Sequence, residues 1–245
     1  MRNIKLLIEY DGTNYLGWQV QPRGLTIQGM IEGKLALLMG ETVHLVGSGR
    51  TDAGVHAFGQ VAHFKTKSKM DVHTIQRALN SLLPPDIVIQ RAEEVKEDFH
   101  ARKQSKSKTY EYRILNRNIR SAFHREYAWH IPQTLNIREM KKATRSLKGE
   151  HDFSSFQSVG SPKRTAVRNV TRAEWKRGRD GLLRFEIEAN GFLKQMVRAI
   201  VGTLVEVGKE KIGFEEFQKI LDSKDRKRAG PTAPAQGLFL KEVKY

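Results

Sequence analysis

Arg50 and Asp52 are the residues whose type and spacing are best suited to chemistry in this sequence. They stand two positions apart in the stretch VGSGRTDAGVHA, residues 46–57, which also contains Gly47, Gly49 and Gly54. Because glycine permits positive φ and close approach of the backbone, the chain can hold both charged side chains on a tight, rigid turn. A carboxylate held in this way can act as a nucleophile or a general base, and its basic surroundings favour the ionised form.

A purely structural turn is the alternative for this loop. In that case Asp52 accepts hydrogen bonds from the backbone N–H groups of Gly54 or Val55, and Arg50 is a solvated charge. The alternative leaves the length of the loop unexplained, since a hairpin needs about two to five residues and this connection uses about ten. In the second half, KRGRDGLLRF contains Asp180-Gly181, which suffices for a two-residue turn. We interpret Asp180 as structural, and this contrast favours Asp52 as the working carboxylate.

The hydrophobic pattern of the first half predicts the elements that position this loop. Alternation of apolar residues predicts strands, and an apolar face that follows the capping residues Thr26 and Asp71 predicts two helices. The strands are expected at residues 3–10, 42–46, 59–66 and 86–95, and the helices at 27–39 and 72–82. The order is therefore β-α-β-β-α-β, with the glycine-rich loop between the second and third strands.

The second half repeats this order. Strands are expected at 108–115, 166–175, 182–189 and 237–245, and helices at 136–149, where Asn136 and Glu139 form a capping signature, at 192–208 and at 214–221. Two such units in tandem are two ferredoxin-like units, an α+β fold with antiparallel sheets and helices on one side. We place the boundary near residues 101–107 and divide the chain into units 1–105 and 106–245.

Composition indicates a partner with negative charge. The 245 residues include 43 Lys and Arg against 27 Asp and Glu, a formal charge of +16. Residues 101–125 hold eight basic residues and one acid, and residues 161–179 hold seven and one. A solvated basic face and an anionic membrane are the alternatives. Neither segment contains a basic amphipathic helix, and aromatic residues stand among the charges, so we favour binding to the phosphate backbone of a nucleic acid.

Several classes of protein are disfavoured. There is no cysteine, which excludes disulfides and Cys-ligated metals. The first apolar run is too short for a signal peptide, and no stretch reaches membrane-spanning length, so we expect a cytoplasmic protein without a membrane partner. His44, His56 and His63 have no spacing typical of a metal site, and we expect no metal. Metal nucleases gather several carboxylates and glycosidases generally use a pair, whereas one loop carboxylate stands out here.

The stretch GRTDAGVHA resembles the signature of tRNA pseudouridine synthases of the TruA type, with Asp52 on the catalytic aspartate of that family. Residues 6–22, 108–114, 190–204 and 233–245 resemble other blocks of the family in order and spacing. The resemblance covers nearly the whole chain. It implies a pseudouridine synthase fold with a mostly antiparallel sheet and a central cleft. It also implies isomerisation of uridine to pseudouridine at positions thirty-eight to forty of the tRNA anticodon stem-loop, by a homodimer without cofactor or metal.

The resemblance also assigns roles to Arg198 and Tyr110, and the place of Arg50 beside Asp52 suggests a third role. Arg198 would be the cation that pairs with Asp52, where the alternative is an arginine that snorkels from an apolar helix. Tyr110 would stack on the flipped uracil and transfer a proton, where the alternative is core packing; Tyr112 is expected to pack. Arg50 would fill the space vacated by the nucleotide or bind a phosphate. The main alternative function is a non-catalytic RNA-binding module, although the sheet motif typical of such modules is absent.

Overall fold

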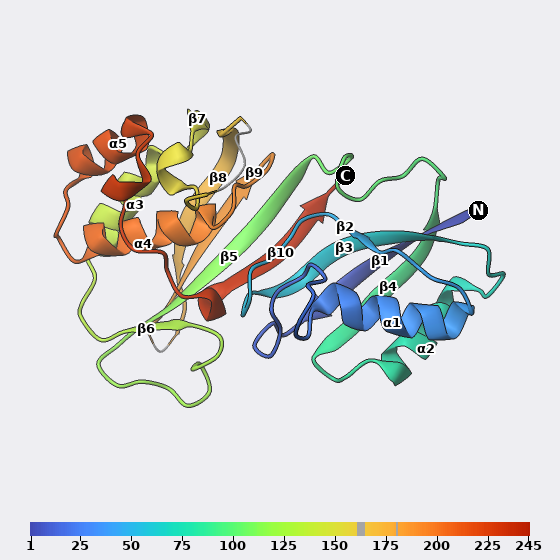
Figure 1. Ribbon diagram of the computed structural model, residues 1–245. Helices are drawn as coiled ribbons and strands as arrows, with labels where there is room; N and C mark the ends of the chain where they lie inside the picture. Colours follow the sequence, from blue (N-terminus) through green and yellow to red (C-terminus); the bar gives the residue numbers. More distant parts are fainter. Residues whose placement is uncertain (161–164, 180) are drawn as a thin grey trace. The chain divides into compact units, whose positions relative to one another are not determined.

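The computed structural model describes residues 1–160, 165–179 and 181–245. The chain has a mixed α/β structure with mostly antiparallel strands, and it divides into two compact units (Figure 1). The first unit comprises Met1–Lys106 together with Phe239–Tyr245, and the second comprises Ser107–Leu238. The turn expected at Asp180 lies outside the described residues. None of the described helices combines the length with the hydropathy that crossing a bilayer requires.

The first unit has the element order that the sequence predicts. Its elements are β1 (Arg2–Tyr10), α1 (Ile27–Met39), β2 (Val46–Gly47), β3 (His56–Thr66), α2 (Val72–Leu82) and β4 (Ile87–Val95). The strands follow the spatial order β4-β1-β3-β2 with antiparallel pairing. The alternation in β1 fully buries Ile4, Leu6 and Ile8. The helices bury Ile31, Leu35, Ile75 and Leu79, so the core of this unit includes the apolar faces of its strands and helices.

Both expected helix caps are confirmed in this unit. The Thr26 side chain accepts a hydrogen bond from the N–H of Gly29, and Asp71 accepts from the N–H groups of His73 and Thr74. Helix α1 ends at Gly40, which adopts the left-handed conformation with φ 66°. Local sequence signals were therefore sufficient to define these two helices.

The strand expected at residues 42–46 is wrong in extent, because β2 contains only Val46 and Gly47. The reason lies in α1, because two of its side chains form hydrogen bonds with the backbone of Leu45, the residue just before β2. The N–H of Leu45 donates to the Glu32 carboxylate at 2.7 Å, and the carbonyl of Leu45 accepts from the Gln28 amide at 3.0 Å. With these groups bonded to a helix, the strand ladder does not extend to Leu45.

The second unit contains more strands than the sequence predicts. Its elements are β5 (Ser107–Asn116), β6 (Trp129–Ile131), α3 (Ile137–Arg145), β7 (Gly149–Asp152), η1 (Ser154–Phe156), β8 (Val167–Arg177), β9 (Leu182–Ala189), α4 (Met196–Gly208), α5 (Phe214–Ser223), η2 (Arg226–Arg228) and η3 (Ala235–Gly237). The strands follow the order β5-β9-β8-β7, and β6 pairs with β5. Strands β6 and β7 were missed because they are too short for alternation to be visible. Helix α4 begins later than expected, since Gln195 has a positive φ of 61°.

The final strand, β10 (Leu238–Lys244), differs from its expected place in the second half. It pairs parallel with β3, with Phe239 opposite His56 and Leu240 opposite Ala57. The Phe239 ring stacks on His56 and on Phe58. Gly59 lets β10 approach β3 closely, because a Cβ atom on Gly59 would stand 2.7 Å from the Lys241 carbonyl oxygen. The last seven residues therefore belong to the first unit. Sequence order alone could not reveal this pairing partner.

Gly33 of α1 and Gly202 of α4 both lie inside helices, but the space around them differs. Gly33 of α1 has open space around it, with no atom within 4 Å of a Cβ built there. Gly202 of α4 faces a segment that crosses the helix, and a Cβ there would clash with the Pro231 carbonyl oxygen. The N–H of Gly230 donates to the Thr203 hydroxyl at 2.9 Å, which fixes this crossing segment on α4.

Replacement of each glycine by alanine separates helix propensity from packing. Gly33→Ala is expected to raise the free energy of unfolding by about 0.5–1 kcal/mol, because alanine is the better helix former. Gly202→Ala is expected to lower it by about 1–3 kcal/mol, because the added methyl group overpacks a backbone contact. Urea unfolding of the two variants measures the difference. Shifts of the same sign in both would contradict the packing described for Gly202.

Candidate functional site

The loop from Ser48 to Val55 connects β2 to β3 and carries Arg50 and Asp52. A β-turn closes it, with the N–H of Val55 donating to the backbone carbonyl of Asp52 at 3.2 Å and Gly54 at the third position with φ 74°. Gly54 is the one loop glycine of the three with a positive φ. Gly47 instead allows a close approach, since a Cβ atom there would stand 2.6 Å from the Trp18 indole nitrogen. Positive φ is thus found at Gly54 and close approach at Gly47, which are the two properties of glycine on which the prediction of a tight turn rests.

Backbone carbonyls accept the hydrogen bonds of two N–H groups in this turn. The N–H of Gly54 donates to the Tyr15 carbonyl at 3.3 Å, and the N–H of Val55 donates to the backbone carbonyl of Asp52 at 3.2 Å. These are the two donors that the purely structural alternative assigns to the carboxylate. Asp52 is half-buried, and the role of its side chain stays a prediction.

A second loop, residues 11–25, packs backbone against backbone on the Asp52 loop. The N–H of Trp18 donates to the Thr51 carbonyl at 3.1 Å. A Cβ atom on Gly17 would stand 2.5 Å from that carbonyl oxygen, and one on Gly12 would clash with the carbonyl oxygen of Val55. The loops approach this closely only because both positions are glycine. The backbone on either side of Asp52 is thereby held in place.

Buried polar side chains complete this support. The Tyr10 hydroxyl lies 2.8 Å from the Thr51 hydroxyl, and burial raises the pKa of Tyr10 well above its ordinary value, so the phenol stays neutral. The Ser48 hydroxyl donates to the Gln60 amide oxygen at 2.7 Å, and the Gln60 amide nitrogen donates to the Gly49 carbonyl at 3.0 Å. Each of these groups is satisfied, which makes the network rigid rather than costly. Sequence reasoning missed it, because nothing local marks Tyr10 or Gln60.

Arg50 and His56 flank the turn. Arg50 is exposed, and its Nε donates to the Gln19 side chain at 3.0 Å. His56 is buried, with Nδ1 located 3.0 Å from an Asp11 carboxylate oxygen and 3.1 Å from the Gly12 nitrogen. The N–H of Gly12 donates to Nδ1, and the Asp11 carboxylate lies beside the same nitrogen, so His56 connects β3 to the neighbouring loop.

Arg198 lies on α4 in the second unit, where a backbone segment orients it. Its Nε donates to the Ala233 carbonyl at 2.7 Å, and its own carbonyl accepts from the N–H of Ala233 at 3.1 Å. This is the segment for which Gly202 leaves room. Arg198 is half-buried on a helix whose neighbouring residues are buried. The side chain is therefore fixed at Nε by a carbonyl rather than extended freely along the helix.

Two tyrosines of β5 have different surroundings. Tyr110 is buried and meets the edge of Phe192 with ring centroids 5.0 Å apart. Tyr112 is fully buried, and its hydroxyl donates to the Pro234 carbonyl at 2.8 Å. Burial raises the pKa of Tyr112 well above its ordinary value, and the positive charge of Arg198 lowers it in part. The prediction that Tyr112 packs is confirmed. Phe192 was missed, since an aromatic residue before an apolar helix carries no distinctive signal.

The structure thus assigns the expected site residues to two places. Arg50 and Asp52 lie in the first unit, and Tyr110 and Arg198 lie in the second. The pairing of Asp52 with Arg198 and the chemical roles of all four residues stay predictions. In the described part of the chain, no three His, Asp or Glu side chains converge in a way that would hold a metal ion. What the geometry provides is a braced loop with one carboxylate and an oriented guanidinium in a strongly basic protein.

Comparisons with known proteins define the class to which this site belongs. The family model described as tRNA pseudouridine synthase matches residues 6–128 and 143–245. A tRNA pseudouridine synthase A of Thermoanaerobacter sp. (strain X514) is 49% identical over 245 residues, and one of Acetivibrio thermocellus is 50% identical over 245 residues. Each match covers 100% of this chain and 100% of the relative. The class is thus that of isomerases that convert uridine to pseudouridine in tRNA.

A more distant relative agrees with these two. The tRNA pseudouridine synthase A of Geobacter sulfurreducens is 46% identical over 246 residues, again with 100% of both chains covered. The family model and the relatives extend through both units, so neither unit is an addition to a smaller enzyme. The chain belongs to the tRNA pseudouridine synthase family.

Gly12→Ala tests the support of the loop that carries Asp52. The added methyl group meets the Val55 carbonyl oxygen and displaces the turn that carries Asp52. We expect the rate of pseudouridine formation to fall about 10²-fold, because a small misplacement of a reacting group has an effect of this size. Affinity for tRNA is expected to stay close to that of the wild type. Gly33→Ala, which adds the same group in open space, is the control. Unchanged activity of Gly12→Ala would show that the two loops do not need this contact.

Proposed function

We propose that this protein isomerises uridine to pseudouridine at positions thirty-eight to forty in the anticodon stem-loop of tRNA, with Asp52 as the catalytic carboxylate. One observation carries the proposal. Asp52 stands on a loop that two glycines and a buried network hold rigid, and backbone carbonyls accept from the N–H groups of Gly54 and Val55 in its turn. The full-length similarity to tRNA pseudouridine synthases A of several bacteria supports the substrate.

The chemistry needs little beyond a placed carboxylate. The bond between C1′ of the ribose and N1 of the base breaks, the base turns, and a bond forms between C1′ and C5. The hydrogen on C5 is then lost as a proton, and N1 gains one, so atoms and charge balance without an oxidant. A carboxylate serves as the nucleophile at C1′ or as the base, and the proposal holds for either. The rigid loop keeps that carboxylate in place while the base moves.

Arg198 and Tyr110 complete the proposed site. With Nε bonded to Ala233, the terminal nitrogens of Arg198 are directed by a fixed backbone segment, as expected of a cation that stabilises the Asp52 anion. Tyr110 presents a ring whose orientation is set by the edge contact with Phe192. An oriented ring suits stacking on the detached uracil and transfer of the C5 proton. Both roles follow from the family resemblance and agree with these local contacts.

Arg50 suits the step that exposes the nucleotide. A base inside a stem must leave its stack before it reaches a carboxylate, at a cost of a few kcal/mol. Arg50 is exposed on the catalytic loop two residues before Asp52, and its Nε bond to Gln19 sets its direction. Its planar guanidinium either fills the vacated space or binds a phosphate. We assign Arg50 to substrate binding rather than to bond breaking.

We further infer that each unit is a variant of the ferredoxin-like arrangement, that a central cleft receives the RNA, and that the enzyme is a cytoplasmic homodimer. The strand order β4-β1-β3-β2 of the first unit supports the first point, as do the neighbouring strands β5-β9-β8 of the second. The dimer follows from the family resemblance. Light scattering of the purified protein measures it directly, and a monomer at all concentrations would contradict it.

Asp52→Asn tests the proposed chemistry. Asparagine keeps the size of the side chain but is neither a nucleophile nor a base at neutral pH. Release of tritium from tRNA labelled at C5 of uracil is expected to fall at least about 10²–10⁴-fold, while tRNA binding persists. Primer extension after carbodiimide treatment maps the modified position.

Asp98→Asn is the control, since Asp98 is an exposed carboxylate of the same unit. It is expected to keep full activity. Full activity of Asp52→Asn would contradict catalysis by Asp52, and absence of tritium release by the wild type would favour the RNA-binding module. Strand scission or free uracil would instead indicate a nuclease or a glycosidase.

A further inference from the structure

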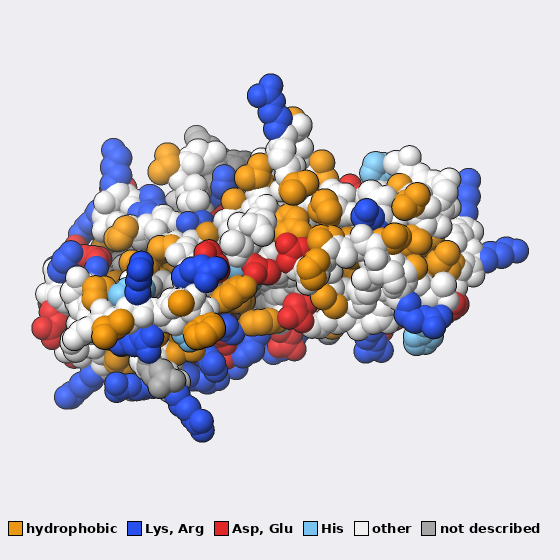
Figure 2. All heavy atoms as spheres, turned by 90° about the horizontal axis from the view of Figure 1, so that it is seen from below, with side chains coloured by type: hydrophobic (Ala, Val, Ile, Leu, Met, Phe, Trp, Pro, Cys, Tyr) orange, Lys and Arg blue, Asp and Glu red, His pale blue; other side chains and the backbone are white. Residues whose placement is uncertain are grey.

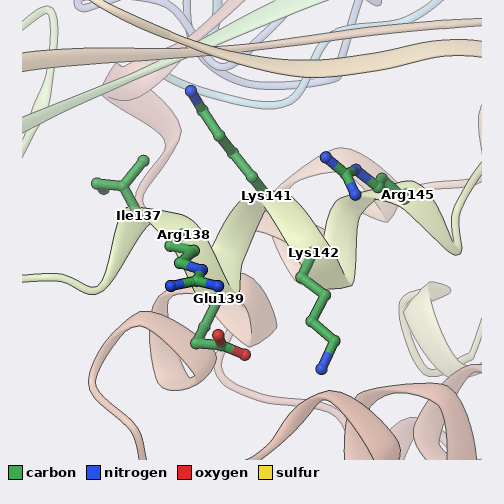
Figure 3. A pocket seen from close by; sticks show the side chains of 6 residues that line it. All are labelled: Ile137, Arg138, Glu139, Lys141, Lys142 and Arg145. Carbon is green, nitrogen blue, oxygen red and sulfur yellow. The ribbon is translucent and has the colours of Figure 1, made fainter.

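Helix α3 (Ile137–Arg145) carries exposed side chains of mostly one charge. Its exposed positions are Arg138, Lys141, Lys142 and Arg145, and Lys148 continues them just beyond the helix. We call these five residues the α3 basic face. Figure 3 shows Lys141 and Arg145 on one side of the helix and Arg138 and Lys142 on the other, around a shallow pocket. Figure 2 shows that Lys and Arg side chains are also numerous on the face of the molecule drawn there.

The cations of the α3 basic face lack anionic partners. Among the residues that the structure describes, no carboxylate forms an ion pair with any of the five. The acid of the helix itself, Glu139, is half-buried in the first turn and is not within ion-pair distance of them. Lys142 is held over the Phe214 ring of α5, 4.6 Å from its centroid. Five positive charges therefore lie on α3 and just beyond its end without a carboxylate ion-pair partner among the described residues.

Helix stability explains only part of this arrangement. Lys142 and Arg145 lie in the last turn, where cations interact favourably with the helix dipole. Arg138 is the second residue of the helix, and a cation in the first turn is unfavourable for the same reason. Other surface helices carry mixed side chains, such as His73, Arg77 and Asn80 on α2. A helix exposed to solvent does not need an unbroken row of cations. The cations near the N-terminus of α3 therefore require another explanation.

The opposite side of α3 holds the row firmly in place. Met140, Ala143 and Thr144 are buried, and the Thr144 hydroxyl accepts a hydrogen bond from the Trp175 indole at 2.9 Å. The rise from Arg138 to Arg145 is about 10 Å along the helix axis. A rigid helix of this length presents its cations at fixed intervals, as needed to contact successive phosphates of one strand.

We propose that the α3 basic face binds the phosphate backbone of the tRNA substrate and contributes affinity rather than chemistry. The inference rests on the proposed function for the identity of the RNA. Charge complementarity favours a polyanion, and the exposed positions of the face are all Lys or Arg, whereas a membrane-binding helix would place large apolar side chains beside them. Lys and Arg contacts of this kind position a nucleic acid without reading its sequence.

The double variant Arg138→Gln/Lys141→Gln tests this surface. It removes the two cations within the helix that precede its last turn, so the melting temperature is expected to stay the same or to rise slightly. The dissociation constant for full-length tRNA, measured from 50 to 200 mM salt, is expected to increase. The slope of log affinity against log salt should decrease by about 1 for each lost contact, or about 2 in total. KM for tRNA should rise while kcat at saturating tRNA stays unchanged.

Lys69→Gln/Arg77→Gln is the matched control, because it removes two exposed cations from the first unit and lowers the net charge equally. Its salt slope is expected to equal that of the wild type. If the α3 variant shows the wild-type slope and KM, or if both variants change them equally, the proposed surface is wrong, and an acidic protein partner or a solvated face would account for the charges. Absence of tritium release by the wild type would instead overturn the proposed function, a result distinguishable from either binding outcome.

Discussion

The close packing of two loops at Gly12 and Gly17 is the constraint on which the position of the loop that carries Asp52 depends. Backbone carbonyls of Thr51 and Val55 occupy the space where side chains would otherwise begin. The N–H of Gly54 also donates to the carbonyl of Tyr15, which joins the turn to the second loop. A site for base exchange needs such support, because the reacting base moves and the carboxylate must not.

The same principle orients the guanidinium of the second unit. Gly202 lets the segment around Pro231 cross α4 at backbone distance, and the Ala233 carbonyl then binds the Nε atom of Arg198. The Arg198 guanidinium is thus directed by a main-chain group rather than by another flexible side chain. Main-chain groups within packed segments have little freedom, so a charged side chain bonded to them keeps its direction.

The exposed charges of α3 differ in their surroundings from the charged residues proposed for the site. The lysines and arginines of α3 are exposed and lack carboxylate partners in the described residues, which suits weak, additive contacts with phosphates. Arg198 and Asp52 are half-buried, where a single partner and a fixed geometry matter more. The net charge of +16 is consistent with an enzyme whose substrate is a large polyanion.

The sequence by itself determined the elements with strong local signals. Thr26, Asp71 and Gly40 define the ends of helices because capping depends on residues only a few positions apart. The alternation of β1 and the glycine-rich stretch around Asp52 are equally local. The tertiary structure alone decided the remaining features, which are the short strands β6 and β7, the pairing of β10 with β3 and the contact of Gly12 with Val55. The two short strands contain too few residues to form a visible pattern. The other two features join residues that are remote in the chain, and no short stretch of sequence encodes such contacts.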